Sequence, residues 1–391
     1  MELSERIRRR RQKVGVQQLV RDYSALSPVA HLEEPSGRGP VFERLLDHLE
    51  PVFDGQLPPN GYLYGPSGSG KSAVVTSLFE HLGQLSAKSQ SMIHTSTRSV
   101  SPTSPSFVYI DLRGVASEFA FYHDVLDGLV NEQVPHHGVS TGEIRDRLHG
   151  ILDALRAGLV IGVDHVGEPD TPNTEALVEL FAGLPSNVTW LAVGQTPPSR
   201  LALTEYTARS IRVERYQRQM LVDVVMSRAS EGLAGQALDH TLARRIADWA
   251  EGDAHDALAA LFTAADHAGQ ADRSYVAESD VTAAVEELPR PSVSLARVLQ
   301  LPENKQTVLR ELLKLDPEEC ESVTDTAESI GNSPSIDLSA ATVERYLYEI
   351  AELGIVERVQ LTTPSRKGRP PSRIELRFPP TVFRRLFDLG R

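Results

Sequence analysis

The sequence predicts an α/β protein in which a parallel-sheet nucleotide-binding domain is followed by a helical lid and a winged-helix domain. Apolar strands alternate with helices over the first half of the chain, which favours a parallel sheet. A Gly-rich octapeptide that begins at Gly65 joins one of these strands to a helix. Near the carboxyl end, three helices precede two strands, which is the order of a winged helix.

The elements of the sheet domain follow from the hydrophobic pattern and the turn residues. Leu159–Val163 is a continuous apolar run, as expected for a strand covered on both faces. Ser86–Ser106 is rich in serine and threonine and contains two prolines, which favours a surface loop. We expect strands at 62–64, 107–112, 159–163, 188–193 and near 211–213, and helices at 41–52, 72–85, 118–129, 140–157 and 174–184.

The pattern becomes helical from Tyr216 onward. The segment Pro289-Arg290-Pro291 interrupts it, because proline breaks helices. In the last long helix, Val343, Leu347 and Ile350 are spaced to share one buried face. We expect lid helices at 217–231, 239–250, 256–268 and 277–288, followed by helices at 303–315, 323–330 and 339–353 and strands at 355–361 and 374–378.

The chain of 391 residues is long enough for two or three domains, at roughly 100–200 residues per domain. No apolar run reaches the ~18–20 residues of a membrane helix, and the charged start lacks a signal peptide's apolar stretch. We therefore expect a cytoplasmic protein without a membrane partner. The expected segments are a basic amino-terminal arm at 1–25, a nucleotide-binding base at 26–215, a helical lid at 216–290 and a winged-helix domain at 291–391.

Charge is distributed unevenly along the chain. The formal net charge is −13, yet residues 1–13 carry six basic and two acidic side chains, and residues 361–391 carry eight basic and two acidic ones. An acidic middle with basic ends is compatible with nucleic-acid contact confined to a few arginine-rich patches. The acidic composition, with arginine preferred over lysine, fits a salt-loving or GC-rich source.

The octapeptide Gly65–Ser72 matches the phosphate-loop pattern G-x-x-x-x-G-K-[ST] in full. Its glycines let the backbone wrap around phosphates, and the following helix presents the positive end of its dipole. We expect Lys71 to reach the β- and γ-phosphates and Ser72 to bind Mg²⁺. The candidate nucleotide-binding residues are Gly65, Pro66, Ser67, Gly68, Ser69, Gly70, Lys71, Ser72 and Ala73.

A nucleotide site also needs a carboxylate for its metal ion. Asp164 ends the apolar run and is the candidate second Mg²⁺ ligand and a candidate catalytic residue, the alternative being a cap on the next turn. His165 follows, where hydrolytic enzymes of this class usually place a glutamate that polarises the attacking water. A neutral imidazole accepts a proton near pH 7 but carries no negative charge, so hydrolysis is in doubt. Glu168, nearby in sequence, is given no catalytic role.

The predicted winged helix carries the candidate DNA contacts. Thr342 and Arg345 lie opposite the apolar face of its third helix, where base edges and phosphates would be met in the major groove. The loop 364–373 is basic and contains glycine and proline, which suits phosphate or minor-groove contact. Its candidate residues are Arg366, Lys367, Arg369 and Arg373. The alternative is a winged helix that contacts only proteins.

The order of these parts resembles the archaeal replication initiators of the origin-recognition and helicase-loading family, AAA+ ATPases related to the eukaryotic origin recognition complex. The resemblance covers the chain from about Asp22. It includes Pro59-Asn60 and Leu63-Tyr64-Gly65 before the loop, Gly252-Asp253-Ala254 in the lid and Glu352-Leu353-Gly354-Ile355-Val356 in the winged helix. It implies ATP between base and lid. It also implies duplex DNA held by the winged helix and an insertion helix, matched here by 118–129.

Three positions depart from that family's pattern. The acidic pair Asp-Glu is Asp164-His165 here, and the polar sensor, usually Asn, falls to Gln195 or Thr196, with Thr196 the candidate catalytic residue. The lid arginine that touches the γ-phosphate is replaced by His255. The resemblance therefore implies a diverged, haloarchaeal-type paralogue that binds ATP or ADP with Mg²⁺ and hydrolyses ATP slowly or not at all.

These inferences favour an origin-type, double-stranded DNA-binding replication initiator that recognises origin-like repeats and works with a replicative helicase or other initiator paralogues. One alternative is an active AAA+ loader ATPase, which a steady-state hydrolysis assay would separate. Another is a nucleotide-binding transcriptional regulator or plasmid copy-control protein, which a genome-wide footprint would separate. The arginine finger stays open, with Arg209 one candidate among several.

Overall fold

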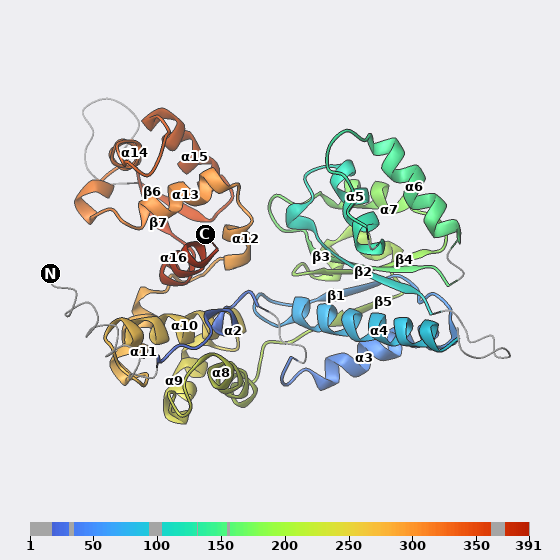
Figure 1. The fold of residues 1–391 in the computed structure, drawn as a ribbon, viewed down its shortest axis with the longest axis horizontal. Coiled ribbons are helices and arrows are strands. Elements are labelled where there is room, and N and C mark those ends of the chain that lie inside the picture. Colours follow the sequence, from blue (N-terminus) through green and yellow to red (C-terminus); the bar gives the residue numbers. More distant parts are fainter. Residues whose placement is uncertain are drawn as a thin grey trace, which may run out of the picture. The chain divides into compact units, whose positions relative to one another are not determined.

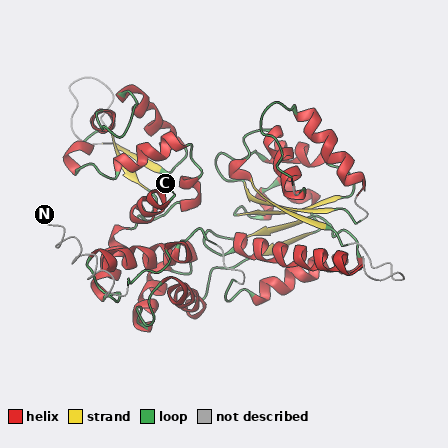
Figure 2. Ribbon diagram, in the orientation of Figure 1, coloured by secondary structure: helices red, strands yellow, loops and turns green. Residues whose placement is uncertain are grey.

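The computed structural model describes residues 18–30, 35–93, 104–130, 132–154, 157–360 and 372–390. The chain divides into two units, residues 31–216 and residues 1–30 together with 217–391. The first unit holds a sheet with helices on both faces (Figures 1 and 2). In its described part, the second unit is helical with one small β-hairpin.

The described part of the first unit contains a parallel sheet of five strands in the order β2–β3–β4–β1–β5. β1 lies between β4 and β5, so that Tyr62 pairs in register with Ala192 on one side and Ser210 on the other. The strands are β1 (Gly61–Tyr64), β2 (Ser106–Asp111), β3 (Leu159–Val166), β4 (Val188–Gly194) and β5 (Arg209–Arg212). The predicted parallel α/β sheet is therefore confirmed.

Apolar side chains pack in two layers, one on each face of this sheet. Successive residues of β3 alternate between them, because Ile161 enters one cluster and Val160 the other. A Cβ at Gly162 would come within 2.9 Å of Phe79, so glycine lets a helix lie close to the strand. One layer contains α3 (Gly39–Leu49) and α4 (Lys71–Ile93), and the other α5 (Glu118–Leu129), α6 (Thr141–Ala154) and α7 (Thr174–Ala182).

Helix α4 differs from its predicted length. It continues to Ile93 instead of ending at Leu85, so the expected loop is wrong for residues 86–93. Residues 94–103 lie outside the described part of the chain. The physical reason is that no proline occurs before Pro102, and the alanine, lysine, glutamine and methionine of this stretch tolerate a helix well.

Four long helices form the lid, and an amino-terminal segment packs on them. Val20 bridges to Leu233, and buried Arg228 donates from Nη1 to the carbonyl of Ala25 at 2.9 Å. Residues 19–30 thus belong with the lid, although the sequence analysis grouped residues from 26 onward with the base. The elements are α2 (Tyr23–Leu26), α8 (Arg218–Gly232), α9 (His240–Ala250), α10 (Ala254–Gln270) and α11 (Glu278–Glu287).

A winged-helix arrangement follows the lid. Ser339 caps its third helix, and Val343, Leu347 and Ile350 are buried, as predicted. Two helices were not predicted, α12 (Leu295–Leu299) and the carboxyl-terminal α16 (Pro380–Leu389), which packs against α10. The remaining elements are α13 (Glu303–Leu312), α14 (Val323–Gly331), α15 (Ala340–Glu352) and the antiparallel strands β6 (Val356–Gln360) and β7 (Ser372–Leu376). No helix among the described residues is long and apolar enough to span a membrane.

Candidate functional site

The phosphate loop connects the carboxyl end of β1 to the first residue of α4. A Cβ at Gly65 would lie 2.1 Å from the carbonyl oxygen of Val213, and one at Gly70 would lie 2.7 Å from Oη of Tyr216. The φ of Gly70 is +75°, in the left-handed region that other residues adopt at a cost. Glycine at both positions therefore lets the backbone form a close cradle at the amino end of α4, which fits a bound phosphate.

Lys71 is buried in this loop. Its Nζ donates to the carbonyl oxygens of Gly65 at 2.9 Å and Pro66 at 2.8 Å and lies 3.4 Å from Oγ of Ser69. The ammonium group is thus held against the loop backbone, where it would neutralise phosphate charge. The neighbouring Ser72, the proposed Mg²⁺ ligand, is partly exposed. The loop residues fit a nucleotide phosphate, and their individual roles stay predictions.

Asp164 lies within β3 and is 1% exposed. Its Oδ2 accepts a hydrogen bond from the hydroxyl of Tyr109 at 2.7 Å, and its Oδ1 accepts one from the backbone N–H of His165 at 2.6 Å. Burial, and then the nearby charge of Asp164, hold the pKa of Tyr109 well above its usual range. A buried carboxylate with two fixed donors is well oriented, as a magnesium ligand must be.

His165 is held between carboxylates. Its Nδ1 lies 3.1 Å from Oε1 of Glu168, and its Nε2 lies 3.7 Å from Oδ2 of Asp164 and 3.8 Å from Oδ1 of Asp111. Burial lowers the pKa of His165, but the charges of Asp164 and Glu168 outweigh burial, so that the pKa rises above its ordinary value. These surroundings therefore favour the charged form of the ring more than water does. The sequence pattern had allowed a neutral, proton-accepting ring at this position.

Glu168 was given no role from the sequence, yet the fold brings it into this group. Besides His165, it accepts a hydrogen bond from Nε2 of Gln195 at 3.0 Å. The pKa of Glu168 is lowered because the favourable partners His165, Arg113 and Gln195 outweigh its burial. The backbone N–H of Glu168 donates to the carbonyl of His165, which closes a tight turn. That i,i+3 turn is the sequence feature that brings the two side chains together.

The two candidates for the polar sensor occupy different surroundings. Gln195 joins Glu168, whereas the carbonyl oxygen of Thr196 accepts a hydrogen bond from the hydroxyl of Tyr62 at 2.7 Å. The structure thus connects Gln195, more directly than Thr196, to the side chains around Asp164. Arg209, the candidate arginine finger, is exposed on the edge strand β5, and its role stays a prediction.

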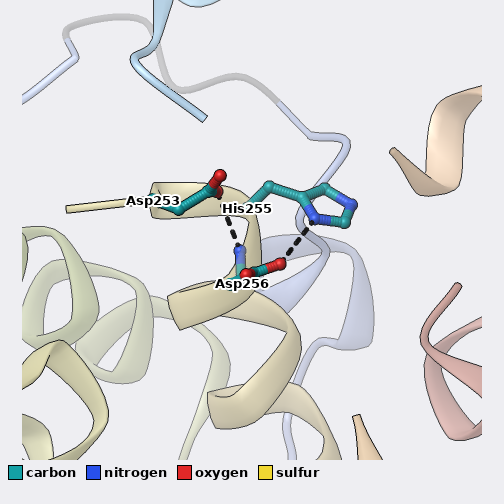
Figure 3. Close-up of side chains that lie close together, drawn as sticks. All are labelled: Asp253, His255 and Asp256. Carbon is teal, nitrogen blue, oxygen red and sulfur yellow. Dashed lines mark hydrogen bonds and ion pairs between the residues drawn. The ribbon is translucent and has the colours of Figure 1, made fainter. Parts of the chain in front are cut away.

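His255 lies in the other unit, in the first turn of α10 (Figure 3). Its Nε2 accepts a hydrogen bond from the backbone N–H of Leu295 at 3.0 Å, while its Nδ1 lies 3.6 Å from Oδ1 of Asp256. Asp253 accepts from the backbone N–H of Asp256 and thereby caps the helix. These three side chains lie close enough to surround a cation, but each already has a partner within the fold, and we assign no metal to them.

The candidate DNA contacts on α15 are partly engaged by neighbours. Oγ1 of Thr342 lies 2.9 Å from Oγ of Ser339, within the helix cap. Arg345 is exposed, with its Nε 3.7 Å from Oε1 of Glu349. Nζ of Lys305, on α13, lies 2.9 Å from Oε2 of the same glutamate. Lys305, which the sequence analysis did not select, therefore helps to offset the acidic charge of this surface.

The predicted basic wing lies mostly outside the described residues, which include neither Arg366, Lys367 nor Arg369. Arg373 is described and is the second residue of β7, where its Nε donates to Oε1 of Glu375 at 2.9 Å. Two further cations of the carboxyl-terminal basic end, Arg384 and Arg385, lie on α16. Both approach the buried carboxylate of Asp266, at 3.6 Å and 2.5 Å. The basic end is thus less available for DNA than its charge suggests.

Comparison with known proteins agrees with this fold. Residues 34–191 match the model of the AAA ATPase domain. The chain is 23% identical over 349 residues to the ORC1-type DNA replication protein of Thermococcus onnurineus, covering 84% of this chain and 81% of that protein. The chain is thus similar, over most of its length, to archaeal ORC1-type DNA replication proteins. ORC1-type DNA replication protein 10 of Halobacterium salinarum is also 23% identical, over 84% of this chain and 82% of that protein.

The ORC1-type fold extends over both units of this chain. The ORC1 protein of Aeropyrum pernix, solved in complex with DNA, superposes with a TM-score of 0.63 at 22% identity, covering 95% of this chain and 97% of that one. The AAA+ base, helical lid and carboxyl-terminal winged helix therefore follow the fold of that ORC1 structure. An AAA ATPase domain implies nucleotide binding.

Proposed function

We propose that the chain is a replication initiator that binds ATP or ADP with Mg²⁺, binds origin-type double-stranded DNA, and hydrolyses ATP weakly or not at all. The observation that carries the proposal is the phosphate loop with its buried Lys71, on a chain that also has a winged helix. An initiator acts on the chromosome, so the proposal places the chain in the cytoplasm, with a replicative helicase or related initiators as partners.

Nucleotide would be held by the backbone of the loop and by Lys71, and the metal ion by Ser72 and Asp164. Mg²⁺ would bridge the phosphates and neutralise their charge. The cradle at Gly65 and Gly70 and the fixed, buried carboxylate of Asp164 support this assignment.

Weak hydrolysis follows from the group around His165. The ring of His165 is engaged with Glu168 at 3.1 Å, and it lacks the negative charge that a water-orienting carboxylate would supply at this position. His255 stands at the position of the lid arginine, and its Nε2 already accepts a hydrogen bond from the backbone N–H of Leu295. The side chains at the two positions that would act on the γ-phosphate, His165 and His255, therefore bind other groups of the chain. Lys71 and Asp164, by contrast, match the expected pattern.

DNA binding is proposed for α15 and the basic wing, namely Thr342, Arg345, Arg366, Lys367, Arg369 and Arg373. The printed description of the Aeropyrum pernix neighbour, a complex with DNA, supports it. We add Lys305, because it lies with Arg345 against Glu349 and moderates the repulsion of that carboxylate for phosphates. Origin recognition follows from homology to ORC1-type DNA replication proteins.

Nucleotide binding is tested by Gly70→Ala, which we expect to weaken ADP affinity by roughly 100-fold because the loop could no longer close around phosphate. The added methyl would lie 2.7 Å from Oη of Tyr216, at a φ of +75°. Lys71→Ala should cause a similar loss. The measurement is calorimetric titration with ADP and Mg²⁺. Gly83→Ala, in the same helix α4, is the matched control, since a Cβ there meets no atom within 4 Å. Gly70→Ala binding as tightly as Gly83→Ala would contradict the proposed loop.

DNA binding is tested by replacing Arg366, Lys367 and Arg369 together with glutamine. We expect weaker binding to every duplex. We also expect the slope of log affinity against log salt to fall by roughly 2–3, at about 0.9 per phosphate contact. The measurement is fluorescence anisotropy across a salt series. Replacing Arg44 and Arg212, which are exposed on the first unit, is the control and should leave the slope unchanged. An unaltered slope in the triple variant would refute the wing assignment.

A further inference from the structure

Arg38 is a buried cation without a hydrogen-bonding partner for two of its nitrogens. It precedes α3 as the helix N-cap residue and is 5% exposed. Its Nε and Nη2 are buried, and neither makes a hydrogen bond. A guanidinium that has lost its water without gaining acceptors is unfavourable. Such a group indicates an acceptor that binds from outside the chain.

The guanidinium of Arg38 packs on an aromatic ring beside the phosphate loop. Its Cζ lies 3.5 Å from the ring centroid of Tyr216, a cation–π contact. The hydroxyl of that same tyrosine reaches Gly70, as the 2.7 Å approach to a Cβ built there shows. Arg38 contacts the ring of Tyr216, and the hydroxyl of Tyr216 contacts Gly70. A continuous series of contacts therefore runs from the guanidinium to the residue before Lys71. All three belong to the unit of residues 31–216.

We propose that Arg38 binds a phosphate group of the nucleotide held in the loop, and that Tyr216 positions it. The inference rests on the proposed nucleotide binding and adds one residue and one contact to it. A phosphate is the fitting ligand because it supplies both negative charge and several acceptors for the planar fork of arginine. Tyr216 is also the last residue of its unit, two positions before α8 begins.

The test compares Arg38→Met with the wild-type chain. Methionine keeps an apolar side chain against Tyr216 and removes the donors. We expect ADP affinity to fall at least tenfold, while the melting temperature without nucleotide stays the same or rises, because an unpaired buried charge is removed. A residue with only a structural role would lower that melting temperature. Arg38→Lys keeps the positive charge but lacks the planar fork of donors, and it should retain part of the ADP affinity. It is the variant to use if Arg38→Met folds poorly.

Three further measurements make the outcome decisive. Arg44→Met replaces an exposed arginine within α3, the helix that Arg38 precedes, and should bind ADP as wild type does. The loss in Arg38→Met should be the same for ADP and GDP, because both carry the same phosphates, and a loss confined to ADP would overturn the phosphate contact. Near-wild-type affinity of Arg38→Met, beside a clear loss in Lys71→Ala, would refute the Arg38 inference and leave nucleotide binding intact. Failure of the wild-type chain to bind any nucleotide would refute both.

Discussion

Replacing Asp266 with alanine is expected to lower the free energy of unfolding of the lid and winged-helix unit by about 2–4 kcal/mol. Asp266 is 0% exposed, in the middle of α10. It accepts hydrogen bonds from the hydroxyl of Tyr23 at 2.9 Å and from Nε of Arg385 at 2.8 Å. The expected loss is below that of a fully buried pair, because the Arg385 side chain is 37% exposed and would regain some water.

The effect is large because one carboxylate joins three parts of the chain. Tyr23 comes from α2, Asp266 from α10 and Arg385 from α16, and the guanidinium of Arg385 also lies 4.9 Å from the ring centroid of Tyr23. Burial and the charge of Asp266 raise the pKa of Tyr23 to about 12, so the phenol stays a donor throughout the physiological range. Losing the carboxylate would loosen both terminal segments from the lid at once.

Urea unfolding followed by circular dichroism measures the loss. Asp266→Asn keeps the shape and one acceptor, so it should lie between wild type and Asp266→Ala. Glu286→Ala, an exposed residue on the neighbouring helix α11, is the control and should change stability by less than about 0.5 kcal/mol. The Asp266→Ala defect should persist at 1 M salt, because buried charges are weakly screened. Equal stabilities of the Asp266→Ala and Glu286→Ala variants would contradict the assigned role.

Local patterns in the sequence predicted the elements of the fold, because those patterns act over a few residues. The apolar run at 159–163 lies within β3, and the spacing of Val343, Leu347 and Ile350 matches the buried face of α15. The order of strands and helices then restricts the sheet to a parallel arrangement. The carboxyl-terminal helix α16 was not predicted, although Val382, Phe383 and Phe387 have helical spacing.

Contacts between distant segments could not be read from the sequence. The counts of basic residues placed Arg384 and Arg385 in a DNA-binding end, yet folding brings both to Asp266, more than a hundred positions earlier. Likewise, nothing local to Arg38 indicates that it will lie on Tyr216. The phosphate loop was predictable because it is a contiguous motif. Its neighbours were not, because they depend on the order of the strands.

The second large effect is expected when His165 is replaced by glutamate, the residue that usually follows the metal-binding aspartate in this class of enzyme. In the double variant His165→Glu with Glu168→Gln, we expect steady-state ATP hydrolysis to rise by about 100-fold over wild type, the scale of one well-placed group acting on the reacting water. The first change supplies a carboxylate next to Asp164. The second removes the charge that would otherwise repel it across the 3.1 Å now spanned by the ion pair.

Each change alone should do less, and for different reasons. His165→Glu alone would gather three carboxylates, with Asp164 and Glu168, so one of them would take up a proton and lose its charge. Glu168→Gln alone leaves the imidazole in place and removes only its carboxylate partner. Phosphate release assays at saturating ATP and Mg²⁺ measure the four proteins, and adding Lys71→Ala to the double variant should abolish the gain. If the double variant hydrolyses ATP no faster than wild type, the block lies elsewhere, and the position occupied by His255 in the lid becomes the one to change next.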